Sequence, residues 1–290
     1  MKFDKNTKIL IVGLGLIGGS YAKALSDEGY FVGAIDKKKS SVEYALKNGL
    51  IQVGETSVKK DFVKDFDLIV FALYPHDFIN WIKEYQSSIK SGALITDVTG
   101  VKSFVVENVQ KILRGDLEFV GAHPMAGKEV SGVENADPKI FVGANYIVTP
   151  TKRNTDENVQ AVKDLGRALG FERISSLSPE EHDETVGFLS HLTHCIAVSL
   201  MVSKKSHHLA EYTGDSFRDL TRIAKINDEM WSELFLANKD ELLKQMDLFE
   251  KKFNQLKEDI KNDNREKIRE TLRESTARRK VFDKDAKETK

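Results

Sequence analysis

The chain has 290 residues, 40% hydrophobic and 31% charged, which fits two globular domains with sizeable cores. Its 44 basic and 45 acidic residues leave a net charge of -1, so no charge excess favours nucleic acid or an anionic membrane as a partner. Cys195 is the single cysteine, which excludes an intrachain disulfide. The sequence shows no signal-peptide pattern and no apolar run of about 20 residues. We therefore expect a cytoplasmic protein that neither binds nucleic acid nor spans a membrane.

A nucleotide-binding pattern lies at the start of the chain. The apolar run 8–13 leads into Gly13-Leu-Gly15-Leu-Ile-Gly18, a helical stretch follows, and a second apolar run, 30–35, ends at Asp36. Strand, glycine turn, helix, strand and acid at this spacing are typical of a dinucleotide-binding βαβ unit.

Each part of this pattern has a physical task. The three glycines permit a tight turn, close approach of the pyrophosphate, and close packing of helix on strand, while the helix N-terminus offers free N–H groups to the phosphates. Asp36 can accept hydrogen bonds from the ribose hydroxyls and repels a 2'-phosphate, which favours NAD. The following Lys37-Lys38-Lys39 leaves NADP open. The predicted cofactor-binding residues are Gly13, Gly15, Leu16, Ile17, Gly18 and Asp36.

Further strands are expected in the first half of the chain, at 67–72, 93–97, 118–121 and 144–149, with a helix between 154 and 170. This alternation predicts an α/β Rossmann-type, doubly wound and mostly parallel sheet. Ligands of such folds bind beyond the carboxyl ends of the strands. We therefore expect the segments after the later strands to meet the nicotinamide.

The second half reads as helices alone, starting at Ser178-Pro179. The stretch 185–202 is apolar, but too short and too polar at its start for a membrane span, so burial in the domain or a dimer is expected. Further helices are expected at 216–226, 231–256 and 265–279, with fraying in the last ten residues. The predicted domains are a NAD-binding Rossmann domain, 1–173, and an all-α substrate and dimerisation domain, 174–290.

A few polar residues are candidates for chemistry. His123 follows a predicted strand, where an imidazole can take a proton from an alcohol as hydride leaves; the alternative is a turn histidine bonded to backbone. Arg222 can hold a carboxylate through two parallel hydrogen bonds; the alternative is an exposed pair with Asp219. His191 and His194 lie three residues apart without a Cys or Glu cluster, so no metal site is expected.

Several segments together resemble the prephenate and arogenate dehydrogenases of tyrosine biosynthesis. They extend in family order over most of the chain. The matching segments are the glycine turn with Asp36, Gly-Ala-His123-Pro-Met-Ala-Gly-Lys-Glu129, Ser178-Pro-Glu-x-His182-Asp183, Ser190-His191-Leu-Thr-His194 and Phe217-Arg-Asp-Leu-Thr-Arg222-Ile-Ala.

The resemblance implies roles for these residues. His123 matches the histidine that accepts the proton of the ring 4-hydroxyl as hydride passes to NAD, before the ring carboxylate leaves as carbon dioxide. Arg222 matches an arginine that binds a substrate carboxylate. His191 and His194 match histidines lining the substrate pocket, and Glu129 belongs to the same site. The helical domain is implied to form a homodimer, with the pocket between the two domains.

The chain departs from the family pattern in one loop. The family commonly has Asp-x-x-Ser-x-Lys after the fourth strand, with the serine hydrogen-bonding in the active site. Here the segment is Asp97-Val-Thr99-Gly100-Val-Lys102, with glycine in place of the serine. Either Thr99 or a water molecule could supply the missing hydrogen bond.

The sequence leaves the substrate open. Prephenate carries a keto acid, whereas arogenate carries an ammonium with which Asp215 could pair; the alternative is that Asp215 caps a helix. Oxidative decarboxylation of prephenate is the expected function, and of arogenate the alternative. A 3-hydroxyacid-type dehydrogenase and a non-catalytic NAD-binding sensor are further alternatives. The former depends on a catalytic lysine in its helical domain, so the flanks of His123 argue against it.

Overall fold

A computed structural model of the chain describes residues 1–205 and 208–282. The chain forms two compact units, Met1–Glu241 and Leu242–Lys290, and each is described by itself. The fraying expected for the last ten residues concerns a segment that lies mostly outside the described residues.

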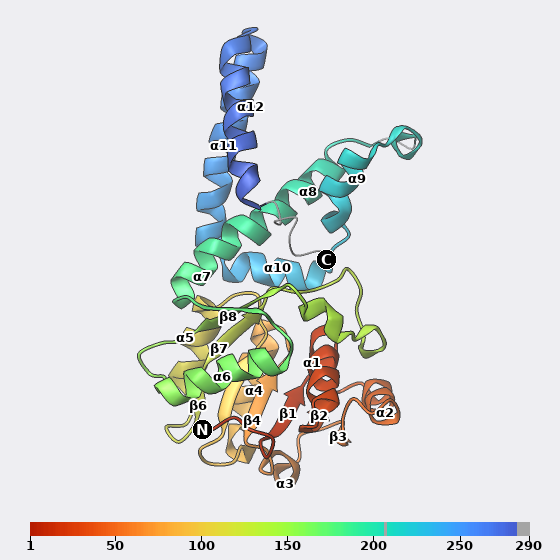
Figure 1. Ribbon diagram of the computed structural model, residues 1–290, viewed down its shortest axis with the longest axis vertical. Coiled ribbons are helices and arrows are strands. Elements are labelled where there is room, and N and C mark those ends of the chain that lie inside the picture. The colour runs from red at the N-terminus through yellow and green to blue at the C-terminus, as the bar shows by residue number, and fades with distance from the viewer. Residues whose placement is uncertain (206–207, 283–290) are drawn as a thin grey trace. The chain divides into compact units, whose positions relative to one another are not determined.

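The first unit is built on a six-stranded parallel sheet with strand order β3-β2-β1-β4-β5-β6 (Figure 1). Because the order reverses between β1 and β4, a crevice for a ligand is expected beyond the carboxyl ends of these two strands. The strands are β1 (Lys8–Val12), β2 (Phe31–Ile35), β3 (Val53–Glu55), β4 (Leu68–Phe71), β5 (Leu94–Asp97) and β6 (Glu118–Phe119).

Helices cover both faces of this sheet. Alternate residues of β1 enter different cores: Ile9 and Ile11 pack with one set of helices, and Leu10 and Val12 with the other. This is why the strand is apolar throughout rather than alternating. One face carries α1 (Leu16–Asp27), α2 (Lys39–Lys47) and α6 (Asp156–Ala168), and the other carries α3 (Lys60–Val63), α4 (Pro75–Tyr85) and α5 (Ser103–Ile112).

A second, three-stranded sheet corrects the expectation for strands 118–121 and 144–149. β7 (Gly121–Pro124) pairs antiparallel with β8 (Asn145–Thr149), and β8 pairs parallel with β9 (Arg173–Ser176). The Val120 N–H still donates to the carbonyl oxygen of Ile95 on β5. Two residues later, the Ala122 N–H donates instead to the side chain of Asp97, at 3.0 Å. The chain therefore leaves the parallel sheet at this point.

A long helical segment opens the second half. α7 (Pro179–Val186) continues through a π-helical turn (Gly187–Leu192) into α8 (Thr193–Val202). Ser178 and Glu181 form a capping box that starts this helix at the expected position. The expectation of a helix too short to span a membrane is therefore wrong on length. The 24 residues Pro179–Val202 are long and apolar enough to cross a membrane, by length and composition only.

The helix expected over 231–256 is interrupted at Asn238. α10 (Asp228–Ala237) ends there and α11 (Lys239–Lys261) follows. The buried Asn238 amide donates to the Asp183 carbonyl oxygen at 2.9 Å, a tertiary contact that no local pattern reveals. The helix expected over 216–226 is also shorter, because α9 (Asp215–Thr221) ends in the 3-10 turn Arg222–Ala224. A further 3-10 turn, Leu209–Tyr212, precedes α9.

The second unit consists of the remainder of α11 and α12 (Arg265–Arg279), followed by the turn Lys280–Phe282. Asp263 has a φ of 53° in the turn between the helices, and Asn264 N–H donates to the Asp259 carbonyl oxygen at 2.8 Å. Large apolar side chains are exposed along α11: Leu243, Leu248, Phe249, Phe253 and Ile260.

Candidate active site

The glycine turn has the shape of a phosphate cradle. Gly13 has a φ of +98°, and a Cβ there would lie 2.4 Å from the Ala72 carbonyl oxygen. A Cβ on Gly18 would lie 1.9 Å from the Gly13 carbonyl oxygen. At Gly15, by contrast, no atom of the described residues beyond its own chain neighbours lies within 4 Å of the Cβ position. The turn is thus tightly packed at Gly13 and Gly18 and open at Gly15, where a pyrophosphate can approach.

The start of α1 completes this cradle. Gly15 is its N-cap and provides no side-chain cap, so the N–H groups of the first turn, at Leu16 and Ile17, are available to an anion. Asp36 accepts hydrogen bonds from the N–H groups of Leu14 at 2.6 Å and Lys38 at 2.7 Å. These bonds hold its carboxylate beside the glycine turn, where it can receive ribose hydroxyls. The residues present therefore fit NAD.

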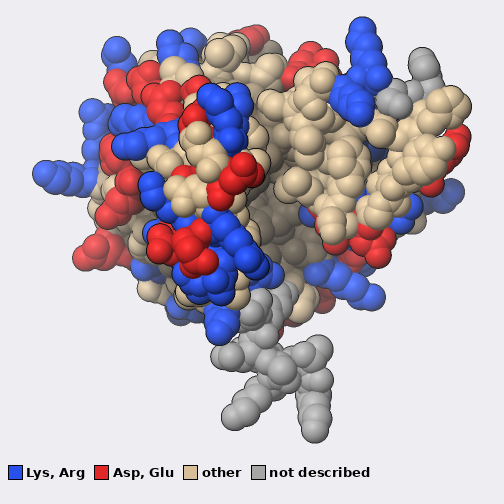
Figure 2. Space-filling view, turned by 90° about the horizontal axis from the view of Figure 1, so that it is seen from above, with Lys and Arg blue, Asp and Glu red and all other residues tan. Residues whose placement is uncertain are grey.

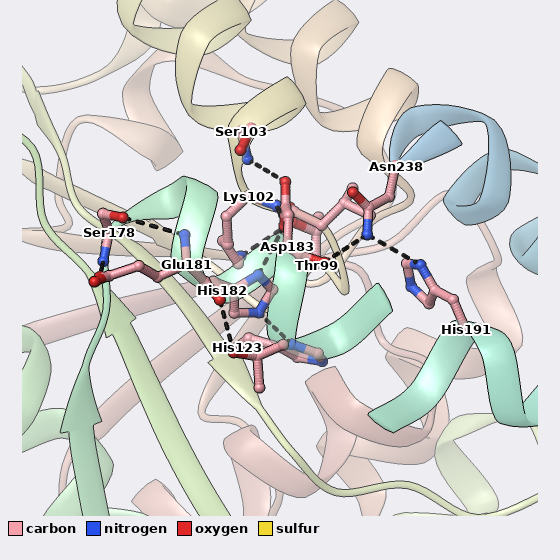
Figure 3. A network of polar contacts seen from close by, with 12 residues as sticks. Thr99, Lys102, Ser103, His123, Ser178, Glu181, His182, Asp183, His191 and Asn238 are labelled. Carbon is pink, nitrogen blue, oxygen red and sulfur yellow. Dashed lines mark hydrogen bonds and ion pairs between the residues drawn. The ribbon is translucent and has the colours of Figure 1, made fainter. Parts of the chain in front are cut away.

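His123, on β7, heads a chain of side-chain hydrogen bonds that runs into the helical region (Figure 3). Its Nδ1 lies 2.8 Å from Nε2 of His182, and Nδ1 of His182 lies 2.8 Å from Oδ1 of Asp183. The Asp183 carboxylate also accepts the N–H groups of Lys102 and Ser103, both at 2.8 Å. Asp183 thus caps the N-terminus of α5 from a helix about 80 residues away.

A buried ion pair lies behind His123. Lys102 Nζ is 2.7 Å from Asp97 Oδ2, and both side chains have no exposed surface. Lys102 also donates to the Ala122 carbonyl oxygen at 2.5 Å. The Thr99 hydroxyl shares its one proton between Asp97 and the Val101 carbonyl oxygen, and its oxygen accepts from Lys102 Nζ at 3.1 Å. These bonds fix the backbone just before His123 and engage the threonine hydroxyl fully.

Two further histidines lie on the helix that follows. The ring of His194 stacks on Trp231 with centroids 3.7 Å apart, and its Nδ1 lies 2.8 Å from the Ser190 carbonyl oxygen. His191 is buried and packs edge-on against Trp231 and Phe235. The two histidines and the two aromatic residues thus form one cluster of packed rings.

Asn238 connects this aromatic group to the hydrogen-bonded chain of His123. Its amide nitrogen donates to the Asp183 carbonyl oxygen and lies 3.3 Å from Nδ1 of His191. Figure 3 shows the Asn238 amide between Asp183 and His191, with a dashed line to each. The break between α10 and α11 therefore holds the two groups together.

Burial decides the electrostatics of the histidines. It lowers the pKa of His123 well below the ordinary value, and the neighbouring His182 and Lys102 lower it further. It also lowers the pKa of His182, against the opposing effect of Asp183, and lowers the pKa of His191 to about 4. All three rings are therefore neutral near pH 7, which is the state a proton acceptor needs.

Arg222 lies at the exposed edge of this group. It forms an ion pair with Glu129, and the two side chains are 64% and 38% exposed. Burial lowers the pKa of His194, and the charge of Arg222 adds to this shift while that of Glu129 opposes it. A guanidinium in this position can exchange its carboxylate partner for one on a substrate.

Comparison with known proteins agrees with this arrangement. Residues 21–173 match the family described as prephenate dehydrogenase, nucleotide-binding domain, and residues 178–274 match prephenate dehydrogenase, dimerization domain. The prephenate dehydrogenase of Bacillus subtilis (strain 168) is 32% identical over 270 residues, which cover 90% of this chain and 72% of the relative. The chain belongs to the prephenate dehydrogenase family.

Solved structures of this family have the same fold. A prephenate dehydrogenase from Aquifex aeolicus, in complex with hydroxyphenyl propionate and NAD+, is 34% identical with a TM-score of 0.87, covering 96% of this chain and 98% of that one. An arogenate dehydrogenase from Synechocystis is 25% identical with a TM-score of 0.82, covering 96% and 100%. The family assignment makes the chain an oxidoreductase with an NAD-binding Rossmann domain.

Two of the expected substrate-site residues are engaged elsewhere in this structure. The Thr99 hydroxyl is held by Asp97 and Val101, so it does not stand in for the family's serine. Asp215 is the first residue of α9, with a side chain that is 92% exposed and paired with Arg218 at 3.3 Å. The described residues hold no group of three or more His, Cys, Asp and Glu side chains that could bind a metal ion.

Four positions of the site have no role predicted from the sequence. For His182 and Asp183 the sequence does hold a signal, a His-Asp pair just after a helix start. Trp231 and Asn238 carry no local signal, because their partners are more than 30 residues away in sequence.

Proposed function

We propose that this chain oxidises and decarboxylates prephenate to 4-hydroxyphenylpyruvate with NAD as the oxidant. The observation that supports this most strongly is the position of His123. Its neutral ring lies between the buried Asp97–Lys102 pair, at the carboxyl end of the parallel sheet, and the helical residues that can hold a substrate. A base in that position can meet both a cofactor on the sheet and a substrate on the helices.

The reaction combines two events, an oxidation at the ring 4-hydroxyl that is assisted by a base and the loss of the ring carboxylate. His123 accepts the proton of the ring 4-hydroxyl as the carbon–hydrogen bond at the same ring atom breaks. NAD, when bound, supplies the acceptor for that hydride. The ring carboxylate leaves as carbon dioxide, and the electron pair of its broken carbon–carbon bond completes the aromatic ring. Aromatisation makes the overall step strongly downhill.

Substrate binding falls to the exposed edge of the site. We assign Arg222 to a substrate carboxylate, with Glu129 as the partner that holds the guanidinium in place until substrate binds. Nδ1 of His194 is bonded to Ser190, and its Nε2 has no hydrogen-bond partner among the described residues, while the buried His191 packs against Trp231 beside it. Asp215 would meet the ammonium of arogenate only after leaving Arg218. These assignments rest on the geometry and on the family resemblance.

The cofactor assignment rests on the glycine turn and Asp36. Gly13 and Gly18 allow the turn, Gly15 leaves room for the pyrophosphate, and the N–H groups at Leu16 and Ile17 point to the phosphates. An Asp36→Ser variant is expected to bind NAD more weakly and to narrow the difference between NAD and NADP, because it removes an acceptor for ribose hydroxyls and a charge that repels a 2'-phosphate.

We further propose a cytoplasmic homodimer with domains at 1–173 and 174–290. Uncharged side chains gather into a broad area on the face shown in Figure 2. The helix Pro179–Val202 leaves Phe188, Leu189, Met201 and Val202 between 46% and 74% exposed, an apolar surface that a second copy would cover. Light scattering across a range of concentrations tests this, and a monomer throughout would contradict it.

The deciding experiment measures NAD reduction by the purified chain with prephenate and, separately, with arogenate. We expect turnover of prephenate, and the ratio of kcat/KM for the two substrates reports the preference. The control is an Asp61→Asn variant, which changes an exposed carboxylate whose ion pair within residues 1–205 and 208–282 is with Lys64. Binding of NAD without turnover of either substrate would contradict the proposal and favour a non-catalytic sensor.

A further inference from the structure

The hydrogen bonds behind His123 have a direction that follows from donor and acceptor chemistry. An ionised carboxylate can only accept hydrogen bonds. Asp183 accepts three, from the N–H groups of Lys102 and Ser103 and from Nδ1 of His182. Burial raises the pKa of Asp183, but His182 and these two N–H groups outweigh it and leave the pKa lowered, so the carboxylate is ionised.

The proton positions on the two rings follow from this. Because Asp183 accepts, Nδ1 of His182 carries the proton of that bond. A neutral His182 then has a bare Nε2, which must accept from Nδ1 of His123 across 2.8 Å. A neutral His123 with its proton on Nδ1 has a bare Nε2.

We propose that His182 and Asp183 are positioning residues that set the tautomer of His123, so that its Nε2 is the proton acceptor. This deepens the proposed function and rests on it for the identity of the proton donor. Neither residue touches the reacting atoms. Their effect is to keep the lone pair of His123 on the side away from His182 and to stabilise the imidazolium that forms when the proton arrives.

Because residue 100 is glycine, the orientation of the His123 ring depends on its hydrogen bond to His182. A Cβ at Gly100 would lie 3.9 Å from Cε1 of His123, so this residue is beside the ring but has no hydroxyl to offer. The Thr99 hydroxyl is held by Asp97. Within residues 1–205 and 208–282, His182 is the one side chain that hydrogen-bonds to the His123 ring.

The charged and titratable groups that act on these rings come from several elements. Lys102 and Asp97 lie on the β5–α5 segment, Asp183 on α7 and His191 on the π-helical turn. Lys102 and Asp97 neutralise each other at 2.7 Å, and His191 is neutral. Asp183 is therefore the group whose charge can stabilise an imidazolium at His123 through His182.

Two substitutions of His182 separate the two bonds. In His182→Gln the amide oxygen occupies the place of Nε2 and can still accept from His123. In His182→Asn the amide reaches Asp183 but not His123. We expect kcat to stay within about tenfold of wild type in the Gln variant, and to fall about 100-fold or more in the Asn variant. The exposed His208→Gln is the matched control.

The pH profile distinguishes positioning from a structural role. Asp183→Asn removes the carboxylate that supports a protonated His123 through His182, so the acid limb of kcat/KM should move to lower pH in this variant. An equal loss of kcat in the Gln and Asn variants, with the acid limb unmoved, would show that His182 only supports the fold and would overturn the inference.

A spectroscopic measurement tests the tautomer without relying on turnover. Long-range nitrogen–proton spectra of the full chain, labelled at histidine and bound to NAD, report which ring nitrogen carries the proton; His123→Asn assigns the signal. We expect Nδ1–H in wild type and Nε2–H in Asp183→Asn. An Nε2–H tautomer in wild type would overturn the inference. Lack of turnover with an Nδ1–H tautomer would contradict the proposed function alone.

Discussion

The interior and the exposed edge of the site are built differently. Around His123, the side chains of Asp97, Lys102 and His182 have no exposed surface, and each is held by the chain itself. At the edge, the side chains of Arg222 and Asp215 are 64% and 92% exposed. The base is thus positioned by folding, whereas the groups assigned to the substrate are free to change partners.

Ion pairs in the interior and at the exposed edge also differ in how much they contribute to stability. Breaking a buried ion pair by removing one partner leaves an uncompensated charge and costs about 3–5 kcal/mol, whereas an exposed pair contributes about 0–1 kcal/mol. Substitutions in the interior should therefore change kcat or stability, and substitutions at the edge should change KM or substrate preference.

The largest effect is expected from His123→Asn. Asparagine cannot accept a proton near neutral pH, so kcat should fall by about 10²- to 10⁴-fold. Binding of NAD, measured by calorimetry, should be unchanged because the glycine turn and Asp36 are untouched. A variant that retained most of its turnover would show that the base lies elsewhere.

The next effect concerns stability. Lys102→Met leaves the buried Asp97 carboxylate without its cation, and we expect the free energy of unfolding to drop by about 3–5 kcal/mol. Denaturant titration measures this. The control is Lys90→Met, which removes an exposed partner of Asp67 and should cost no more than about 1 kcal/mol. Equal losses in the two variants would refute the contrast between interior and surface pairs.

Acid should destabilise the folded chain through His191. Its pKa is lowered from 6.5 to about 4 in the folded state, so the unfolded state binds the proton more readily and stability rises with pH. Above about pH 6.5, His191 is neutral in both states and costs the folded state nothing. As the pH falls from 6.5 toward 4, the free energy of unfolding drops by up to about 3 kcal/mol. His191→Gln should show a shallower fall over this window, and an unchanged slope would count against the assignment.

At the exposed edge, Arg222→Gln should act mainly on substrate binding. Loss of a charged hydrogen-bonding partner for a carboxylate should raise KM for prephenate by about 10- to 100-fold with a smaller change in kcat. Arg218→Gln is the matched control, since Arg218 is exposed and paired with Asp215. A KM equal to that of the control would remove Arg222 from the substrate site.

The smallest effect is expected from Asp215→Asn. The exposed pair with Arg218 contributes less than about 1 kcal/mol to stability, so the fold should be unaffected. If Asp215 meets the ammonium of arogenate, the ratio of kcat/KM for arogenate over prephenate should fall. An unchanged ratio would exclude Asp215 from substrate choice.

Much of the first domain could be predicted because its signals are local. The run before Gly13 and the glycine spacing follow from what one strand and one turn require. β3 and β9 were missed because they are short, and β9 is mostly polar. The split of 118–121 into β6 and β7 could not be predicted, since it depends on the Asp97 side chain replacing a backbone partner.

By itself, the sequence determined the nucleotide-binding unit, the change from strands to helices near Ser178 and the family to which the chain belongs, because periodicity, turn chemistry and motif spacing are local properties. Only the tertiary structure decided that Asp183 caps α5, that His182 bonds to His123, and that Asn238 joins the two groups of the site. Hydrogen bonds between residues 47 to 81 positions apart depend on the packing of whole elements, which no local pattern records.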